Sequence, residues 1–291
     1  MFYGSITALI TPFRDGAVDK KAFADLVEWQ IEQGTNGLVP MGTTGESPTV
    51  SHGEHRDIVA LCVEVAAGRV PVIAGAGSNA TTEAVELATF ARQAGADAIL
   101  TVSPYYNKPS QEGQFLHFKT IAEACGLPVI LYNIPGRSIV EIGVETMARL
   151  RESCPNIIGV KDATANLGRA TLDRQVLGED FVMLSGEDIT ALGYNAHGGQ
   201  GCISVTSNIA PALCARFQAS CTQGDYAGAL KIQDKLAPLH QALFVEPNPA
   251  GAKYAAQKLG LCSAETRLPL VELSDETKPV IDAAMAHAGL I

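Results

Sequence analysis

A lysine at the end of a strongly apolar segment is the residue in this sequence best suited to covalent chemistry. Lys161 directly follows Ile-Ile-Gly-Val at positions 157–160, so its side chain would leave the end of a buried strand. Burial disfavours the ammonium form and can lower a lysine pKa by up to about 3–5 units. The neutral amine is then a usable nucleophile, able to form a Schiff base with a carbonyl compound. The alternative is a structural lysine that pairs with Asp162 or Glu187.

A glycine-rich segment at positions 42–47, Gly-Thr-Thr-Gly-Glu-Ser, could bind the acid group of such a compound. Glycines let a ligand approach the backbone, and the hydroxyls of Thr43 and Thr44 with nearby N–H groups could hold a carboxylate. The same segment could be a tight turn before a helix that Ser51 and Glu54 cap. The two interpretations are compatible, because the capping residues lie downstream of the threonines.

Two further side chains follow another apolar segment. Tyr132 could relay protons, since a phenol both donates and accepts hydrogen bonds; the alternative is a core aromatic residue. The guanidinium of Arg137 could bind a second carboxylate through two hydrogen bonds. The alternative is that Arg137 forms a surface salt bridge. Together with Lys161 and the two threonines, these residues predict a site for a small anionic carbonyl compound, with no metal.

The elements that would position these residues are short, apolar and repeated. Eight runs rich in Val, Ile, Leu and Ala lie at positions 5–10, 37–41, 70–74, 98–102, 128–132, 157–160, 181–184 and 201–205. Their nearly continuous hydrophobicity is typical of strands buried on both faces. Amphipathic stretches separate them, such as 19–33, which Asp19 would cap.

Eight β-α units in series predict an α/β fold, a (β/α)8 TIM barrel, although an open doubly wound sheet gives the same pattern. In a barrel, the segments that follow the strands meet at one rim, which would bring the chemical residues together. The strand pattern ends near residue 210, and helical patterns follow at 213–221, 226–243, 251–259 and 275–288. We therefore predict a barrel with the active site over residues 1–210 and a C-terminal helical region over 211–291.

Composition and charge narrow the classes of function. The 291 residues carry a net charge of −10, which disfavours a general nucleic-acid or anionic-membrane surface,. The seven cysteines include no C-x-x-C pair, so reduced thiols in a cytoplasmic protein are the simplest interpretation,. We find neither a signal-peptide pattern nor an apolar run long enough to cross a bilayer.

Two other motifs carry weaker signals. Residues 75–80, Gly-Ala-Gly-Ser-Asn-Ala, match a dinucleotide fingerprint with Asp97 further along, but Asp97 opens an apolar run instead of ending one,. His52 and His55 flank Glu54 without the spacing of a zinc motif. The remaining histidines form no ligand cluster; they are His117, His197, His240 and His287.

Four motifs in order give the chain a family resemblance. They are Gly-Thr-Thr-Gly-Glu-Ser at 42–47, Tyr-Tyr-Asn at 105–107, Tyr-Asn-Ile-Pro-Gly-Arg at 132–137 and Gly-Val-Lys-Asp-Ala-Thr at 159–164. With them the chain resembles the class I pyruvate-aldolase superfamily, which is N-acetylneuraminate lyase-like. Within it, the chain is most similar to the dihydrodipicolinate (4-hydroxy-tetrahydrodipicolinate) synthase family, which acts in diaminopimelate and lysine biosynthesis. The resemblance covers nearly the whole chain, including Phe-Val-Glu-Pro-Asn-Pro at 244–249.

The resemblance implies a lyase that condenses pyruvate with L-aspartate-4-semialdehyde through a Schiff base. In it, Lys161 attacks the ketone, and the pyruvate carboxylate is held at Thr43 and Thr44. Tyr132 shuttles protons through Thr44, and Tyr106 completes the relay from a neighbouring subunit of a homotetramer. Arg137 holds the carboxylate of the second substrate.

The resemblance also implies that Gly186 and Ile203 line the pyruvate pocket with backbone. No cofactor is needed, because the protonated imine is itself the electron sink. Members inhibited by L-lysine bind it at a dimer interface through residues that match six positions here: Ser47, His52, His55, Asn79, Glu83 and Tyr105. Pro48 stands where some lysine-sensitive members have alanine, which could weaken the response. The alternative is that His52 and His55 merely begin a helix.

Three competing functions remain open. A lyase of the same superfamily that acts on a sialic acid or a 2-keto-3-deoxy sugar acid would share Lys161 and Tyr132. The choice between that lyase and the synthase therefore depends on Thr43 and Arg137. A non-catalytic sensor would keep the pocket without the reaction. A nucleotide-dependent oxidoreductase would have to bind NAD(P).

Overall fold

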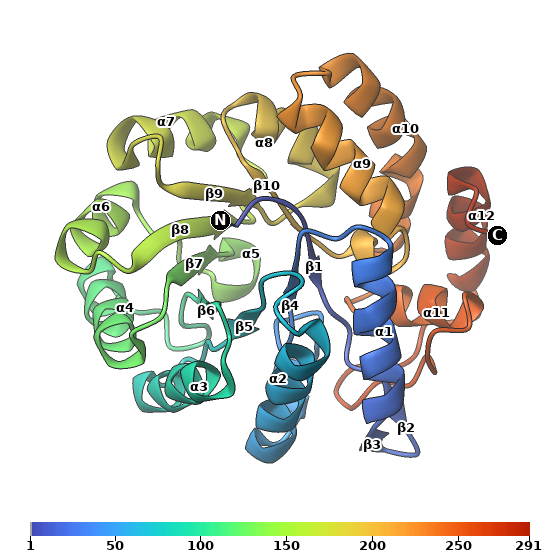
Figure 1. The fold of residues 1–291 in the computed structure, drawn as a ribbon, viewed down its shortest axis with the longest axis horizontal. Helices are drawn as coiled ribbons and strands as arrows, with labels where there is room; N and C mark the ends of the chain where they lie inside the picture. Colours follow the sequence, from blue (N-terminus) through green and yellow to red (C-terminus); the bar gives the residue numbers. More distant parts are fainter. Residues whose placement is uncertain (1) are drawn as a thin grey trace.

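Eight parallel strands form a closed ring at the centre of the protein, whose computed structural model describes residues 2–291 (Figure 1). The strands are β1 (Gly4–Ala8), β4 (Gly37–Val39), β5 (Ile73–Gly75), β6 (Ala98–Val102), β7 (Val129–Asn133), β8 (Ile157–Asp162), β9 (Val182–Ser185) and β10 (Gly201–Ser204). Their order in the sheet is β4-β1-β10-β9-β8-β7-β6-β5. A parallel bridge between Leu38 and Val72 joins the two ends of this order. The predicted (β/α)8 TIM barrel is confirmed, and the open-sheet alternative is wrong.

Helices surround the ring and connect its strands (Figure 1). They are α1 (Lys20–Glu32), α2 (His52–Ala66), α3 (Thr81–Ala94), α4 (Gln111–Cys125), α6 (Val144–Ser153), α7 (Leu167–Leu177), α8 (Ala191–Ala196) and α9 (Pro211–Thr222). A small hairpin of β2 (Phe13–Arg14) and β3 (Ala17–Val18) follows β1, and the short helix α5 (Pro135–Ser138) follows β7. Three 3-10 turns, η1 (Ser47–Thr49), η2 (Asp188–Thr190) and η3 (Thr206–Asn208), complete the barrel loops.

The predicted helix starts have the expected caps. The Asp19 carboxylate accepts a hydrogen bond from the Ala22 N–H at the start of α1. At the start of α2, the Ser51 hydroxyl accepts from the Glu54 N–H and the Glu54 carboxylate accepts from the Ser51 N–H. The predicted capping box is therefore confirmed.

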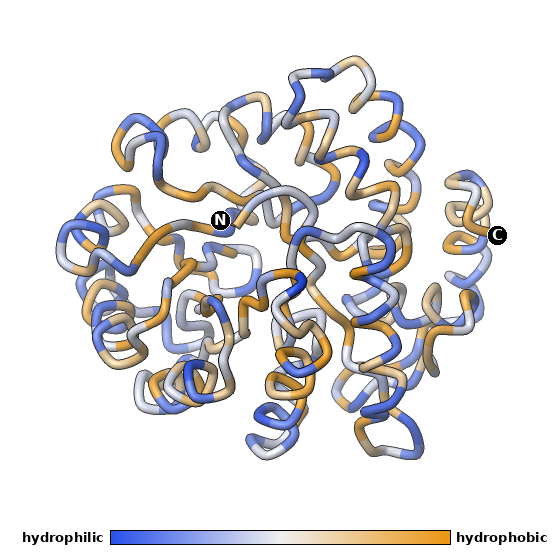
Figure 2. Tube along the Cα trace, in the orientation of Figure 1, coloured by the Kyte–Doolittle hydropathy of each residue, from blue (hydrophilic) through white to orange (hydrophobic). Residues whose placement is uncertain are grey.

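The described residues form two large hydrophobic clusters, and a small third cluster lies around Phe217 of α9. One cluster joins the outer faces of the strands to helix residues such as Phe23 and Phe118. The other contains Ile6, Tyr132 and Ile203 and draws no member from the surrounding helices, so it fills the interior of the barrel,. Figure 2 shows this arrangement, with the central strands mostly apolar and the outer helices alternating between polar and apolar residues.

Three more helices follow α9: α10 (Tyr226–Ala242), α11 (Ala250–Lys258) and α12 (Lys278–Ala288). The four predicted C-terminal helices are confirmed, although α12 begins three positions later than its pattern suggests, with Pro279 in its first turn,. The helix α9 lies against β1 and so packs on the barrel itself. The division of the chain into a barrel and a C-terminal region at residue 210 stays a prediction. Within residues 2–291, no helix is long and apolar enough to cross a membrane.

Candidate active site

A cavity of about 360 Å³ opens where the carboxyl ends of the strands meet. This volume suits a small organic ligand. The cavity brings together six residues that the sequence predicts for the site: Thr43, Thr44, Tyr132, Arg137, Lys161 and Gly186. They come from the carboxyl ends of four different strands or from the loops that follow them, which is the usual arrangement in a barrel enzyme,.

Lys161 lies in the last part of β8 and is only 6% exposed. Strand register explains its neighbour: Tyr132 of β7 is the direct partner of Lys161 in the parallel ladder. The Lys161 Nζ lies 4.1 Å from the centre of the Tyr132 ring. Among residues 2–291, no carboxylate lies within ion-pairing distance of this amine, so the structural pairing with Asp162 or Glu187 is not formed. The amine is therefore available to a ligand.

Gly186 is where the cavity wall comes closest to Lys161. A Cβ atom at this position would lie 2.7 Å from the Cβ of Ala163 and 3.1 Å from the Cε of Lys161. Real Cβ atoms do not tolerate the first of these distances. Glycine therefore leaves the space beside the amine that a ligand carbonyl needs.

The two threonines differ in their surroundings. Thr43 is half-buried, whereas Thr44 is buried and its Oγ1 accepts a hydrogen bond of 3.0 Å from the Asn248 side chain. The turn that carries them is sharp, because Glu46 adopts a left-handed backbone with φ of 57°. Glu46 is buried, and its carboxylate pairs with Lys253 of α11. The turn thus places both threonines in the lining of the cavity that also contains Lys161.

Arg137 is exposed near the end of α5 and has no ion-pair partner within residues 2–291. The alternative of a surface salt bridge is therefore not formed, and the guanidinium is free to bind a ligand at the mouth of the cavity.

Glu187 lines the same cavity as Arg137. Burial raises the pKa of its carboxyl, while the positive charges of Lys161 and Arg137 act in the opposite direction.

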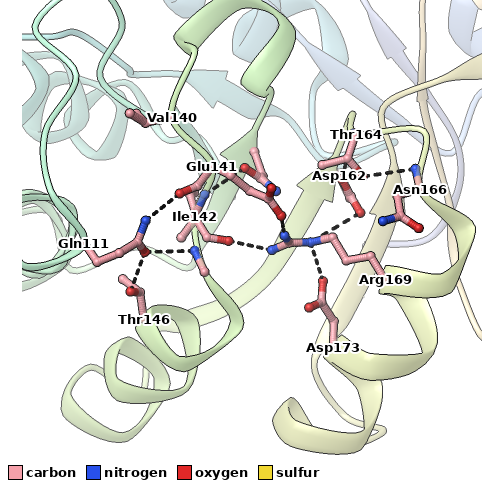
Figure 3. Close-up of polar contacts among 12 residues, drawn as sticks. Gln111, Val140, Glu141, Ile142, Thr146, Asp162, Thr164, Asn166, Arg169 and Asp173 are labelled. Carbon is pink, nitrogen blue, oxygen red and sulfur yellow. Dashed lines mark hydrogen bonds and ion pairs between the residues drawn. The ribbon is translucent and has the colours of Figure 1, made fainter.

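A buried polar network holds the segment that follows Arg137 (Figure 3). Arg169 of α7 donates a hydrogen bond of 2.5 Å to the Ile142 carbonyl and forms an ion pair with Glu141. The same guanidinium lies 3.1 Å from Asp173 and 3.8 Å from Asp162, the residue next to Lys161. The network thereby links the segment after Arg137 to the end of β8.

The two buried acids of this network are shifted by their surroundings. Burial raises the pKa of the Asp173 carboxyl to about 6, even though Arg169 acts to lower it. Burial also raises the pKa of Asp162, which the Thr164 N–H partly offsets by a hydrogen bond of 2.8 Å. Because successive residues of a strand face opposite sides, Asp162 points away from the cavity that Lys161 enters.

Two predicted residues lie elsewhere. Ile203 is buried inside the barrel beneath the cavity and belongs to the same apolar cluster as Tyr132. Tyr106 is 87% exposed, with a left-handed backbone (φ of 71°), and does not line the cavity of its own chain. A role for its hydroxyl in this site requires a second copy of the chain.

The six residues of the predicted lysine site lie on neighbouring loops and helix starts. The His52 Nε2 lies 2.7 Å from Glu83, whose other oxygen accepts a hydrogen bond from Ser78. The Asn79 side chain donates to the Tyr105 carbonyl. His55 is buried, and burial lowers its pKa to about 4. Ser47 begins η1.

Sequence reasoning gave no role in the site to several residues that line the cavity: Ile134, Ala163, Val205, Phe244 and Asn248. Glu187 was considered only as an ion-pair partner of Lys161. Asn248 is the notable omission, because it lies far along the chain, between α10 and α11, yet contacts Thr44. The available signal was the Pro-Asn-Pro sequence between two helical patterns.

The described residues contain no group of three or more His, Cys, Asp or Glu side chains placed to hold a metal ion. Asp97, the acid of the dinucleotide fingerprint, accepts a hydrogen bond of 2.8 Å from the Val72 N–H and so joins the starts of two neighbouring strands.

Comparison with known proteins identifies the family. The model of the dihydrodipicolinate synthetase family matches residues 1–288. The chain belongs to this family. The 4-hydroxy-tetrahydrodipicolinate synthase of Parvibaculum lavamentivorans is 65% identical over 291 residues, covering 100% of both chains.

Two solved structures of family members share the fold. One is the chloride-inhibited dihydrodipicolinate synthase of Acinetobacter baumannii complexed with pyruvate, with a TM-score of 0.97, 45% identity and 100% coverage of both chains. The other is the enzyme of Cyanidioschyzon merolae with lysine bound, with a TM-score of 0.97, 38% identity and coverage of 100% of this chain and 99% of that one.

Proposed function

We propose that this protein condenses pyruvate with L-aspartate-4-semialdehyde to 4-hydroxy-tetrahydrodipicolinate, the product for which its relatives are named. The observation that carries the proposal is the buried, unpaired amine of Lys161 beside Tyr132 in a cavity that also holds Thr44 and Arg137. The amine supplies the nucleophile, and the other three supply the proton relay and an anion site. Pyruvate bound to the related enzyme of Acinetobacter baumannii supports the choice of first substrate.

The first half of the reaction forms an enamine. The Lys161 amine attacks the pyruvate ketone, and loss of water gives a protonated imine. Thr43 and Thr44 hold the pyruvate carboxylate, while Tyr132 carries protons to and from the reacting centre through the Thr44 hydroxyl. Removal of a methyl proton converts the imine to an enamine, because the iminium nitrogen accepts the electron pair.

The second half joins the two substrates. The enamine carbon attacks the aldehyde of L-aspartate-4-semialdehyde, whose carboxylate binds the guanidinium of Arg137. The aldehyde oxygen takes a proton from the relay as the carbon–carbon bond forms. The amino group of the second substrate then attacks the imine carbon and displaces Lys161, which closes the ring and frees the enzyme.

Borohydride reduction in the presence of pyruvate tests the proposal. Mass spectrometry of a digest should place the reduced pyruvyl adduct on Lys161, and K161A should give neither adduct nor condensation. K231A, which removes an exposed lysine of α10, should behave as the wild type. An adduct on another lysine, or turnover in K161A, would refute the assignment, and a pyruvate-binding sensor would show no condensation at all.

The exposed position of Tyr106 supports a relay shared between subunits of a cytoplasmic homotetramer. The test is complementation. Y106F and K161A should each be nearly inactive alone, whereas co-expressed mixed assemblies should regain turnover, because one subunit supplies the lysine and its neighbour the tyrosine. Sedimentation should give the mass of four chains. Mixed assemblies without activity would contradict a relay shared between subunits.

We also propose that L-lysine inhibits the enzyme at the residues around Glu83, in keeping with the lysine-bound relative. Glu83 would bind the side-chain ammonium of lysine in place of His52, while Asn79 and Tyr105 hold its carboxylate. Calorimetry and turnover with saturating lysine test this proposal. Absence of both heat and inhibition would contradict it, and P48A should strengthen the response.

A further inference from the structure

Asn248 contacts the proposed proton relay from a distant part of the chain. It lies between α10 and α11, lines the cavity, and is 5% exposed. Its Nδ2 donates a hydrogen bond of 3.0 Å to the Oγ1 of Thr44, across 204 positions of sequence. Within residues 2–291, the Thr44 hydroxyl makes no other hydrogen bond.

The direction of this bond constrains what Thr44 can do. A threonine hydroxyl has one proton to donate and two lone pairs to accept with, whereas an amide nitrogen only donates. Asn248 therefore occupies one lone pair, and the Thr44 proton must point to another acceptor. Thr44 and Tyr132 line the same cavity, so the proton can point to an acceptor there. An amide donor on the oxygen also makes the hydroxyl a better proton donor, because hydrogen bonds in a chain polarise one another.

We infer that Asn248 is a positioning residue of the reaction: its amide fixes the Thr44 hydroxyl as a donor toward the cavity and so sets the direction of the proton relay. The inference rests on the proposed function, because it needs Thr44 to carry protons. It adds a member to the relay that comes from the segment before α11.

The energetics of Asn248 favour this role over a purely structural one. Its side-chain oxygen, Oδ1, is buried and has no hydrogen-bond partner within the described residues. An unsatisfied buried carbonyl destabilises a fold, so an apolar side chain of similar size would serve packing better. The hydrogen bond to Thr44 is the one contact that only an amide donor supplies here.

The helix after Asn248 is anchored to the same turn of the barrel. Lys253 of α11 forms an ion pair of 2.5 Å with Glu46, two positions beyond Thr44. Its Nζ also donates to the Glu265 carbonyl. The contact between Asn248 and Thr44 is therefore held at both ends, by the barrel turn and by α11.

A double-mutant cycle on N248A and T44V tests the inference. T44V should lower kcat strongly, and N248A should lower kcat by about tenfold while the pyruvate KM changes little. N248A should have almost no further effect in the T44V background, because the amide acts only through the hydroxyl. The isosteric N248D, which replaces the donor by an acceptor, should lose at least as much kcat as N248A. If N248A does not fold, the N248D variant provides the same test of the amide donor.

The control is E246Q, which alters the same segment at a side chain that binds Ser274 and not Thr44. It should keep the wild-type kcat. Multiplicative losses in N248A and T44V, or full kcat in N248D, would overturn the inference while leaving the proposed function intact. If T44V itself keeps full turnover, the proposed relay fails instead. Borohydride trapping of pyruvate on Lys161 should survive in N248A, which separates a defect in proton transfer from a loss of the imine.

Discussion

Lys253 and Glu46 form an ion pair with both side chains completely buried, 2.5 Å from Nζ to Oε1. The Lys253 ammonium also lies 3.9 Å from the centre of the Phe13 ring. Burial lowers the pKa of Lys253, and the Glu46 carboxylate opposes that shift. The pair joins α11 to the turn that carries Thr43 and Thr44, so the C-terminal helices support the catalytic rim directly.

We expect K253M to destabilise the protein by about 3–5 kcal/mol, because it leaves the Glu46 charge buried without a partner. Adding E46Q should recover part of the loss, since it removes that charge. The matched control is K258M on the same helix, where Lys258 pairs with Asp282 at the surface. That pair should be worth less than about 1 kcal/mol. Urea unfolding measures all three, and equal losses in K253M and K258M would contradict the argument.

The close approach of Gly186 to Lys161 makes a second prediction. G186A should reduce pyruvate trapping on Lys161 by at least about tenfold, because the added Cβ crowds Ala163 and the lysine Cε,. Gly168 of α7 provides the control, since a Cβ there would meet its nearest atom at an ordinary 3.4 Å. Mass spectrometry after borohydride reduction compares the two variants, and undiminished trapping in G186A would show that the wall can move aside.

Local chemistry in the sequence was enough to predict the barrel and its helix starts. The run at 98–102 became β6 without change, because four of its five residues are apolar and polar residues bound it on both sides. The run at 70–74 was placed too early: β5 is Ile73–Gly75, since Pro71 lacks the N–H that a ladder needs,. The residues at strand ends, such as Lys161 and Tyr132, met in one cavity because parallel strands share a carboxyl edge.

Contacts made by the returning chain could not be predicted in this way. Asn248 reaches Thr44, and Lys253 reaches Glu46, only because α11 folds back over the rim. Helical periodicity predicts that α11 exists but not which loop it covers. The sequence also did not indicate that Tyr106 would lie exposed and outside the cavity of its own chain.

Arg137 should determine the second substrate. R137A should lower kcat/KM for L-aspartate-4-semialdehyde by at least about tenfold, because a charged hydrogen bond is worth about 1.5–3 kcal/mol. Pyruvate trapping should be unaffected, since the proposed site for pyruvate consists of Lys161 and the two threonines and does not include Arg137. R174A removes an exposed arginine that pairs with Glu179 and should leave both measurements unchanged. If the wild type cleaved a sialic acid, or made one from pyruvate and N-acetylmannosamine, the substrate assignment would be contradicted.

His117 should contribute to the acid sensitivity of the fold. Its ring is buried against Phe118 and bonds to the Thr81 hydroxyl at 2.9 Å, and burial lowers its pKa to about 4. Since the ordinary histidine pKa is about 6.5, the unfolded chain binds a proton in this interval that the folded chain refuses. The stabilisation is therefore complete above about pH 6.5 and is lost as the pH falls toward 4.

Between about pH 7 and about pH 5, this one group should account for about 2 kcal/mol of lost unfolding free energy. H117Q keeps a partner for Thr81 but cannot take up the proton, so its stability should fall less steeply over the same interval. The exposed His287 provides the control, and H287Q should keep the wild-type slope. Urea unfolding at the two pH values measures the difference. An H117Q slope equal to that of the wild type would show that His117 is protonated as easily in the folded chain as in the unfolded one.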